Sequence, residues 1–356
     1  MDLYVLSPNF DRIALIEDYE SVIWNIRYFD VGDFELYISA TSENLRLLKK
    51  SNYIVRDKDI VSGKMHNVMC IETVEINTDS ENGDFITATG RDLKSIVARR
   101  IIWRQTIVSG YVEIAIRQLI IDNLINPSIQ ERKIENVVLG EIKGFTDTMR
   151  QQVTGDNLQE YITSVLTTYG IGWECVLNEN RQICIDFFKG ADRSIAQNDN
   201  PHITFSPENE NILNSDYKMD YKGYKNVALV AGEGEGLNRK TAAAGTANGI
   251  NRYEVYIDSR DASSNEGEID DTAYYAQLTQ KGNEELKKTN YTESFEGEIE
   301  PYANYVYGVD YNLGDTVTVT NLYNVTANPR IIGVIESFSD NGESTIPTFS
   351  TWISED

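Results

Sequence analysis

The stretch from Trp24 to Ala40, WNIRYFDVGDFELYISA, places the tightest constraint on the fold. Its side chains alternate as in β-strands, and Asp30-Val31-Gly32 breaks the alternation in the middle. We therefore predict two antiparallel strands joined by a hairpin turn, with Gly32 at the position that needs a positive φ. Bulky aromatic residues occur on both faces of this hairpin. We expect them to be covered either inside one subunit or between subunits.

The rest of the first hundred residues also favours strands. Asn82-Gly83 lies between two strand-like runs, and this dipeptide is a strong hairpin signal. Two short helices are expected in the same region. One covers 41–50, where Thr41 or Ser42 can cap the first turn, and the other covers 91–100.

The middle of the chain changes to helical periodicity, which indicates an α+β insert. The expected elements are a helix at 109–126 capped by Ser109 and stopped by Pro127, a helix at 156–169 capped by Asp156 and ended by Gly170, and a strand pair at 171–190 that turns at Asn178-Glu179-Asn180. Strands then return up to the C-terminus. They are accompanied by a helix at 270–289 and by flexible polar loops at 232–251 and 260–271.

The predicted fold class is therefore α+β and mainly β, in three parts: 1–100, 101–205 and 206–356. The two outer parts share a weak internal echo, in which a Gly-Asp pair, an Ile-Glu pair and an Asn-Gly pair follow one another. The matching pairs are Gly32-Asp33 with Gly314-Asp315, Ile71-Glu72 with Ile335-Glu336, and Asn82-Gly83 with Asn341-Gly342. Duplication of a β unit and chance similarity both remain open.

The net charge of −24 and the pI of about 4.5 argue against a protein that grips nucleic acid or anionic membrane. DNA that passes nearby without binding is compatible with this charge. The N-terminus has neither a basic region nor a long apolar run, and no segment reaches the roughly 18 apolar residues of a membrane span. We expect a protein that is made in the cytoplasm and has neither a secretory signal nor a membrane span.

Residues suited to metal binding or catalysis are scarce. Three cysteines (Cys70, Cys175 and Cys184) and two histidines (His66 and His202) form no disulfide framework or metal motif, and buried free thiols are expected. The loop before Lys240-Thr241 lacks the glycines of a phosphate-binding loop, and 79–84 lacks the final Glu of a calcium loop. Asp261, Glu268 and Asp270 offer a loose cation site at most, and a solvated acidic loop is favoured. We predict no catalytic, cofactor-binding or metal-binding residues.

The order of the motifs resembles the tail-hub family of long-tailed phages, which is similar to the baseplate hubs of contractile tails and to the N-terminal hub module of tail-associated lysins. The segment 226–239 also fits, and the resemblance spans nearly the whole chain. The matching positions are Trp24, Arg27, Tyr28, Gly32, Phe34, Glu35 and Leu36 near the N-terminus, and Leu313, Gly314, Asp315, Arg330 and Ile331 near the C-terminus.

The resemblance implies two tail-tube-like β-barrels per subunit, with the insert at the periphery or towards the tip, and a homotrimer whose six barrels form a ring. It also implies a place in the virion tail, assembled in the host cytoplasm. Expected partners are distal-tail or tail-tube ring proteins, the tape-measure protein and tip or fibre proteins, and DNA would cross the lumen without specific binding. The family often continues into a wall hydrolase or fibre, whereas this sequence stops at Asp356, so a bare structural hub is expected.

Two other classes of protein remain as alternatives. One is a tail-associated cell-wall hydrolase, a glycosidase or peptidase housed in the insert, although the sequence singles out no pair of carboxylates for it. The other is a carbohydrate-binding β protein, which the count of 21 tyrosines would suit.

Overall fold

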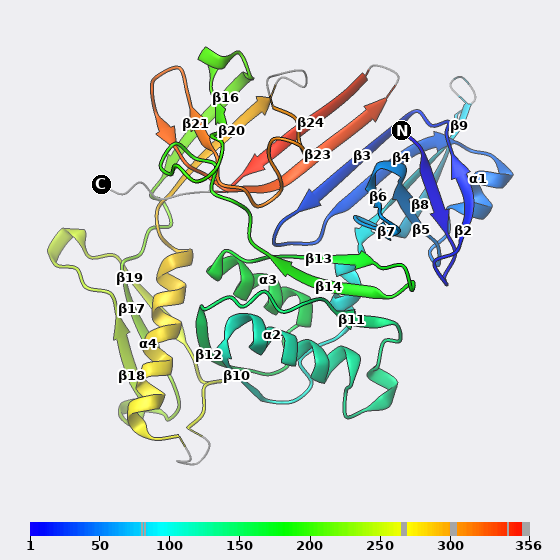
Figure 1. Cartoon of the computed structure of the whole chain (residues 1–356). Helices are drawn as coiled ribbons and strands as arrows, with labels where there is room; N and C mark the ends of the chain where they lie inside the picture. The colour runs from blue at the N-terminus through cyan, green and yellow to red at the C-terminus, as the bar shows by residue number, and fades with distance from the viewer. Residues whose placement is uncertain (80, 82, 265–268, 300–304, 340–341, 351–356) are drawn as a thin grey trace.

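The computed structural model of the chain describes residues 1–79, 81, 83–264, 269–299, 305–339 and 342–350. Strands gather into a large sheet at the N-terminal end, an α+β body lies beside it, and smaller sheets occupy the rest (Figure 1). The predicted class, an α+β fold that is mainly β, is confirmed. Within the described residues, no helix has both the length and the apolar character needed to cross a bilayer.

The main sheet has nine strands in the order β2-β1-β5-β8-β9-β4-β3-β23-β24. Their bounds are β1 (Leu3–Leu6), β2 (Arg12–Ile16), β3 (Ser21–Arg27), β4 (Asp33–Ser39), β5 (Tyr53–Arg56), β8 (Met69–Asp79), β9 (Gly83–Asp92), β23 (Ile331–Ser339) and β24 (Gly342–Phe349). Strand β23 pairs antiparallel with β3, so the C-terminal hairpin extends the N-terminal sheet.

The sheet curls around an apolar core. Along β3 and β4 every second residue is buried, and these side chains pack with those of β9, because alternate residues of a strand point to the same face. Arg56 on β5 and Glu336 on β23 would lie about 24 Å apart in a flat sheet, since four strands separate theirs. Their side chains nevertheless meet at 2.7 Å (Nη1 to Oε2), so the sheet forms a half-barrel.

The turn between β3 and β4 corrects the prediction for Gly32. This residue has no positive φ. Glycine is required there for space, because a Cβ would lie 2.5 Å from the carbonyl oxygen of Asn25 and 3.0 Å from Oδ2 of Asp92. The Gly32 amide donates to that same carboxylate at 2.8 Å. The constraint is therefore tertiary contact and not turn geometry.

Most other local predictions in the first hundred residues are confirmed. The β8–β9 hairpin turns at Gly83, whose φ is +95°, while Asn82 lies outside the described residues. Helix α1 (Ser42–Leu47) is capped by Thr41, whose Oγ1 accepts from the Asn44 amide at 3.0 Å. The helix expected at 91–100 is a 3-10 helix at Leu93–Arg99.

The insert contains two helices and two small sheets. Its elements are β10 (Thr106–Tyr111), α2 (Val112–Ile120) with a π-helical turn at Ile121–Ile125, β11 (Val137–Leu139), β12 (Thr148–Val153), α3 (Leu158–Tyr169), β13 (Gly172–Leu177) and β14 (Ile183–Phe188). β10 pairs with β12. The other three insert strands join two short strands of the first region, β6 (Ile60–Val61) and β7 (Lys64–Met65), in the order β11-β14-β13-β7-β6.

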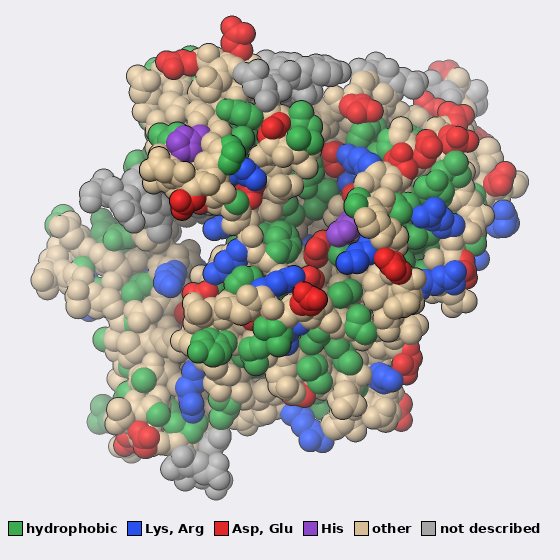
Figure 2. All heavy atoms as spheres, in the orientation of Figure 1, with side chains coloured by type: hydrophobic (Ala, Val, Ile, Leu, Met, Phe, Trp, Pro, Cys, Tyr) green, Lys and Arg blue, Asp and Glu red, His purple; other side chains and the backbone are tan. Residues whose placement is uncertain are grey.

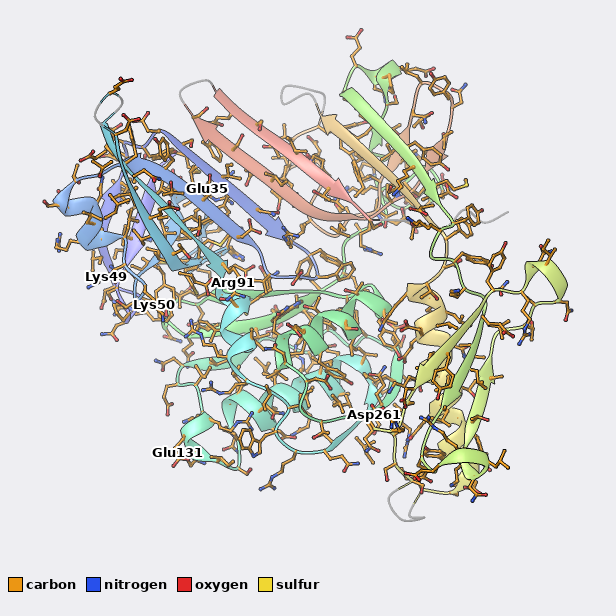
Figure 3. All side chains as sticks on the ribbon, turned by 180° about the vertical axis from the view of Figure 1, so that it is seen from behind. Glu35, Lys49, Lys50, Arg91, Glu131 and Asp261 are labelled. Carbon is orange, nitrogen blue, oxygen red and sulfur yellow. The ribbon has the colours of Figure 1, made fainter. Side chains whose placement is uncertain are left out.

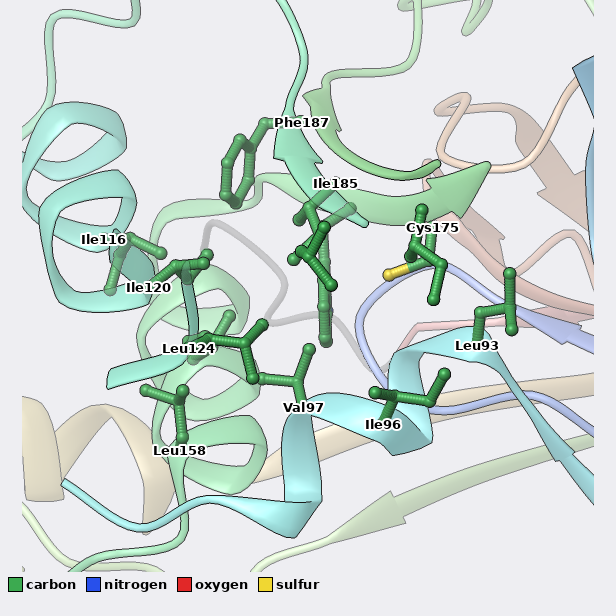
Figure 4. Close-up of a cluster of buried hydrophobic side chains, with 14 of the residues drawn as sticks. Leu93, Ile96, Val97, Ile116, Ile120, Leu124, Leu158, Cys175, Ile185 and Phe187 are labelled. Atoms are coloured by element: carbon green, nitrogen blue, oxygen red, sulfur yellow. The ribbon is translucent and has the colours of Figure 1, made fainter. Parts of the chain in front are cut away.

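The insert and the first region share one hydrophobic core. Leu93 and Val97 of the 3-10 helix lie in the same buried cluster as Ile116 and Leu124 of the α2 segment and Ile185 of β14 (Figure 4). Burial of this many aliphatic side chains joins the two parts into one packed body.

Both predicted N-caps of the insert helices are wrong. Ser109 lies inside β10, which pairs with β12 as far as Tyr111, so the strand ladder takes the backbone that a cap would need. Helix α3 is capped by Asn157, one residue after the predicted Asp156, through bonds from the amides of residues 159 and 160. The predicted end at Gly170 is confirmed, since this residue adopts the left-handed conformation with φ +64°.

The last third of the chain forms three small sheets besides its contribution to the main sheet. Their strands are β15 (Thr204–Phe205), β16 (Ile212–Asp220), β17 (Val227–Ala231), β18 (Thr241–Ala244), β19 (Glu254–Asp258), β20 (Thr292–Ile299), β21 (Thr318–Thr320) and β22 (Thr326–Ala327). The sheet orders are β15-β21-β22, β16-β20 and β18-β17-β19.

Within this third, β17, β18, β19 and helix α4 (Asp271–Lys288) form a separate unit, here called the α4 unit (residues 227–288). Its small core includes Ala228, Val230, Tyr274 and Leu278. Gly282 allows the helix to approach the sheet, because a Cβ there would lie 2.6 Å from that of Ala244. The prediction of a flexible loop at 232–251 is wrong in part, since this segment includes strand β18.

The predicted boundaries at 100 and 205 stay a prediction. The internal echo is only partly matched in space. Both Ile-Glu pairs lie in hairpin strands of the main sheet, but Ile71 is buried and Glu72 exposed, whereas Glu336 is buried and Ile335 half-buried. A bulge in β8 between Ile71 and Thr73 accompanies this change of face. Asn341 lies outside the described residues.

Candidate functional site

The N-terminal signature residues lie on both faces of the β3–β4 hairpin. Trp24, Phe34 and Leu36 are buried on the inner face, and the rings of Trp24 and Phe34 are 5.4 Å apart. Trp24 and Phe34 are therefore covered inside one subunit, whereas Phe29 and Tyr37 are half-buried. The alternative of burial between subunits stays a prediction for these two residues. On the outer face, Arg27 and Asp33 form an exposed ion pair at 3.2 Å. Glu35 is also exposed and lies on the same side of the sheet as Arg91 (Figure 3).

Tyr28 is the centre of a junction between three parts of the chain. It follows β3 and is fully buried, and its hydroxyl donates to the carbonyls of Gly170 at 3.2 Å and Phe188 at 3.1 Å, both in the insert. Its own amide donates to the carbonyl of Ile332 in the C-terminal hairpin. Burial raises the pKa of the Tyr28 phenol, so the hydroxyl stays a donor.

Glycines make room for the Tyr28 ring. A Cβ at Gly172 would lie 2.1 Å from Cε2 of this ring, and one at Gly314 would lie 2.3 Å from the same atom. Gly190 packs against the backbone of Gly314 in the same way, with only 2.0 Å left for a Cβ. The Arg330 guanidinium lies over this ring, with Cζ 5.7 Å from the ring centroid. Its Nη1 donates to the Gly314 carbonyl at 2.5 Å.

The segment after β3 is also held by the insert. Trp173 Nε1 donates to the carbonyl of Phe29 at 2.6 Å, and Thr163 Oγ1 donates to the same oxygen at 3.1 Å. Buried Lys94 donates from Nζ to the carbonyl of Arg27 at 2.8 Å. The backbone carbonyls of this connection thus find partners in the insert and the 3-10 helix, which fixes the hairpin relative to both.

The C-terminal signature residues complete the junction. Asp315 is buried and accepts from the amides of Ala191 at 2.7 Å and Asn312 at 2.9 Å, and from the guanidinium of Arg193 at 2.8 Å. Leu313 is half-buried against the cores of both β regions, and Ile331 is buried in the C-terminal core. The signature positions of both ends therefore meet through Tyr28, Gly314 and Arg330.

A buried charge network inside the half-barrel escaped the sequence analysis. Arg56, only 1% exposed, donates to Asp59 at 2.5 Å and 3.1 Å and to Glu336 at 2.7 Å, and Lys58 contacts the same Glu336. The guanidinium also lies 5.0 Å from the Trp24 ring. Burial by itself would raise the pKa of Glu336, but Arg56 and Lys58 outweigh burial and lower that pKa. The Ile-Glu echo marked Glu336 but gave no hint of its partner.

The other residues considered for chemistry have structural partners. His66 Nδ1 lies 3.2 Å from Glu174, and His202 Nε2 lies 2.7 Å from the Gln197 carbonyl. Asp261 pairs with Lys281 and Asp270 caps α4, while Glu268 lies outside the described residues. The three cysteines are free thiols. Among the described residues, no group of three metal-binding side chains comes together.

A polar crevice separates the insert from the α4 unit, between α3 and β12 on one side and α4 on the other. It has a volume of about 310 Å³. Two of its carboxylates are engaged: Glu284 accepts from Gln151 at 2.6 Å and from Gln280 at 3.0 Å, and Asp261 binds Lys281. Asp156 and Glu285 also line the crevice. A glycosidase would need one carboxyl group as acid and another as base or nucleophile, and among the described residues that line the crevice the geometry singles out no such pair.

The chain was compared with protein-family models, curated proteins and solved structures. The family model described as Siphovirus ReqiPepy6 Gp37-like protein matches residues 2–349. No curated protein matches the chain. Three solved structures share its fold at low sequence identity. They are a tail protein from Neisseria meningitidis MC58 (14% identity, TM-score 0.57, 98% of this chain and 96% of that one), the 43 kDa tail protein of prophage MuSo2 from Shewanella oneidensis (12%, 0.60, 98% and 98%) and prophage tail protein gp18 from Listeria monocytogenes EGD-e (10%, 0.54, 98% and 94%).

These matches cover nearly the whole chain, including the insert and both β regions. The resemblance to phage tail proteins is thereby confirmed. The chain belongs to the family described as Siphovirus ReqiPepy6 Gp37-like protein, and it has the fold of phage tail proteins.

Proposed function

We propose that this chain is the hub of a phage tail tip, a structural protein that joins the six-fold tail tube to the tip. The observation that carries the proposal is the full-length agreement with tail proteins: the family model spans residues 2–349, and three tail proteins share the fold over 98% of the chain. Proteins named as tail proteins share the fold over nearly the whole chain, so we assign this protein a structural function that depends on interfaces and not on catalysis.

The hub is proposed to be a homotrimer. The main sheet ends in two edge strands, β2 and β24, and an edge strand can pair with another chain. Ile13 and Leu15 on β2 are 46% and 41% exposed, so a strand of another subunit that pairs with this edge would also cover apolar side chains. Three subunits, each with two β regions, would present a pseudo-six-fold surface to a distal-tail or tail-tube ring.

The charge of the chain suits a conduit for DNA. A net charge of −24 keeps DNA from binding to a wall that it must pass. In this role the protein belongs to the virion tail, with tape-measure, tip and fibre proteins as further neighbours.

The oligomeric state is the first test. Native mass spectrometry of the purified chain should give about three times the 40.3 kDa subunit mass. The measurement is repeated with the tail-tube or distal-tail ring protein present, because a hub can assemble on its partner. A monomer at high concentration under both conditions would overturn the proposal.

Two further assays test the alternatives. Clearing of peptidoglycan in a zymogram would assign the chain to the wall hydrolases, and specific binding on a glycan array would assign it to the carbohydrate-binding proteins. We expect neither signal from the purified chain.

A further inference from the structure

The first β region carries a concentration of positive charge on an otherwise acidic protein. A surface hollow there is lined by four basic side chains and one carboxylate. They are Lys49, Lys50, Arg91, Arg99 and Glu72. Figure 3 shows the three labelled basic residues, Lys49, Lys50 and Arg91, on the same side of the region. We call this the basic hollow. In a chain of net charge −24, a local excess of cations is the reverse of the average surface.

Among the residues that the structure describes, three of these cations have no ion-pair partner. Arg91 is engaged, since it donates to both oxygens of Glu72 at 2.7 Å and 2.8 Å. Lys49, Lys50 and Arg99 are exposed, and in the part of the chain that the structure describes they form no ion pair. The pKa of Glu72 reports the charges in the hollow. The hydrogen bond from Arg91 lowers this pKa most, and the positive charges of Arg99 and Lys50 lower it further.

The same β region carries an acidic counterpart. Glu17, Asp18 and Glu20 are exposed in the loop between β2 and β3, beside a second hollow that Glu43 also lines. Tyr19 anchors this loop through a hydrogen bond from its hydroxyl to the Met1 carbonyl at 2.8 Å. In Figure 2 acidic side chains gather over the upper part of this region and basic ones below them. We call residues 17–20 the acidic loop.

We propose that the basic hollow is a carboxylate-binding site whose occupant is the acidic loop of a second copy of this chain. This inference rests on the homotrimer of the proposed function and names a contact within it. A head-to-tail ring requires two different, complementary patches on each subunit, and these two patches have opposite charge and adjoin different hollows. Pro8 and Tyr53, which also line the basic hollow, give walls against which the aliphatic part of an acidic side chain can pack.

Nucleic acid fits the basic hollow less well. A phosphate chain would extend beyond the few cations onto a surface of high negative charge.

Charge reversal in both patches tests the proposal. The variants are K50E/R99E in the basic hollow, E17K/D18K in the acidic loop, and the combination of all four changes in one chain. The matched control is K222E/K287E, which changes the net charge as K50E/R99E does but at exposed lysines far along the chain. Native mass spectrometry and sedimentation velocity measure the trimer, in the presence of the ring protein where the wild type needs it.

Each two-residue variant should weaken trimer association by about tenfold or more, since opposed charges at an interface become like charges. The four-residue variant should recover the trimer, and the control should remain trimeric. Raising the salt from about 0.1 M to about 1 M should weaken the wild-type trimer as well, because the Debye length shortens to about 3 Å.

Recovery in the four-residue variant separates a restored contact from damage to the fold. A trimer that withstands both two-residue variants, or one that the combination fails to restore, would overturn the contact while the hub proposal stands. A wild type that never forms a trimer would overturn both. A short labelled single-stranded oligonucleotide that binds the wild type and not K50E/R99E would assign the basic hollow to nucleic acid instead.

Discussion

The main sheet and the α4 unit are attached to the insert in opposite ways. Between sheet and insert lies a continuous apolar core, and the Tyr28 ring is enclosed by glycines from segments far apart in the sequence. Between insert and α4 unit lies a polar crevice, crossed by hydrogen bonds such as the one from Gln151 to Glu284. The α4 unit has its own small core. An interlocked apolar contact holds two parts as one body, whereas a small polar contact permits relative motion.

The largest effect is expected from Arg56→Met, which breaks the buried network inside the half-barrel. The change leaves Asp59 and Glu336 buried without their guanidinium partner. Removal of one partner of a buried ion pair destabilises a protein by about 4 kcal/mol. Urea denaturation of the variant should show this loss in the free energy of unfolding. Arg46→Met, on an exposed side chain of α1, is the control and should change it by about 0.5 kcal/mol or less.

Such a loss would show that the half-barrel depends on the network that Arg56 forms with Asp59 and Glu336. A loss of about 1 kcal/mol or less for Arg56→Met would show instead that the two strands are held by the sheet and its apolar core alone.

Gly172→Ala tests the junction itself. The added methyl group would occupy a position 2.1 Å from the Tyr28 ring, and neither the ring nor the β13 backbone has free space to give way. Overpacking of this kind is expected to cost about 3 kcal/mol of unfolding free energy. Gly223→Ala is the matched control, since no atom lies within 4 Å of its Cβ position and its φ is not positive. Equal stability of the two variants would contradict the interlocked junction.

A comparison of Gly170 with Gly32 shows what the sequence could predict. Periodicity and turn signals identified the β3–β4 and β8–β9 hairpins, the helices and the end of α3 at Gly170, because these depend on neighbouring residues. The role of Gly32 was assigned to φ and proved to be space, since the atoms that crowd it come from Asn25 and from Asp92. A contact with a residue sixty positions away leaves no trace in local pattern.

The same limit applies to the candidate site. Motif order singled out Tyr28, Gly314 and Arg330, but only the fold brings them together with Gly172. Ser109 is a suitable residue for a helix N-cap, but its backbone pairs with Arg150 in the β10–β12 ladder. No sequence signal showed that Arg56 is buried in an ion pair, because its partner Glu336 lies 280 residues later in the chain.

The pH dependence of stability tests whether the charges of the half-barrel network are present in the folded state. Arg56 and Lys58 outweigh burial and lower the pKa of Glu336 in the folded protein. A lowered carboxyl pKa stabilises the fold at pH values above the ordinary pKa of 4.5, and this contribution is lost as the pH falls through the folded-state value.

Glu336→Gln should therefore be less stable than the wild type by about 2 kcal/mol at about pH 7, and the gap should narrow as the pH falls towards about 3. Urea denaturation curves across this range measure the gap. A gap that stays constant with pH would show that Glu336 is not a charged partner of Arg56.

The smallest effect on global stability is expected at the crevice, where Gln151→Ala removes the hydrogen bonds to Glu284 and from Tyr161. Unfolding free energy should fall by about 1 kcal/mol or less, because the contact is polar and solvated. Hydrogen exchange should respond more clearly: amides of α4 should exchange faster while those of α3 keep their protection, since the α4 unit opens without unfolding the insert. Gln118→Ala, which removes a hydrogen bond between α2 and the π-helical turn that follows it, is the control. Faster exchange in both α3 and α4 would show that the crevice is as firmly joined as the Tyr28 junction, and the contrast between the two attachments would fall.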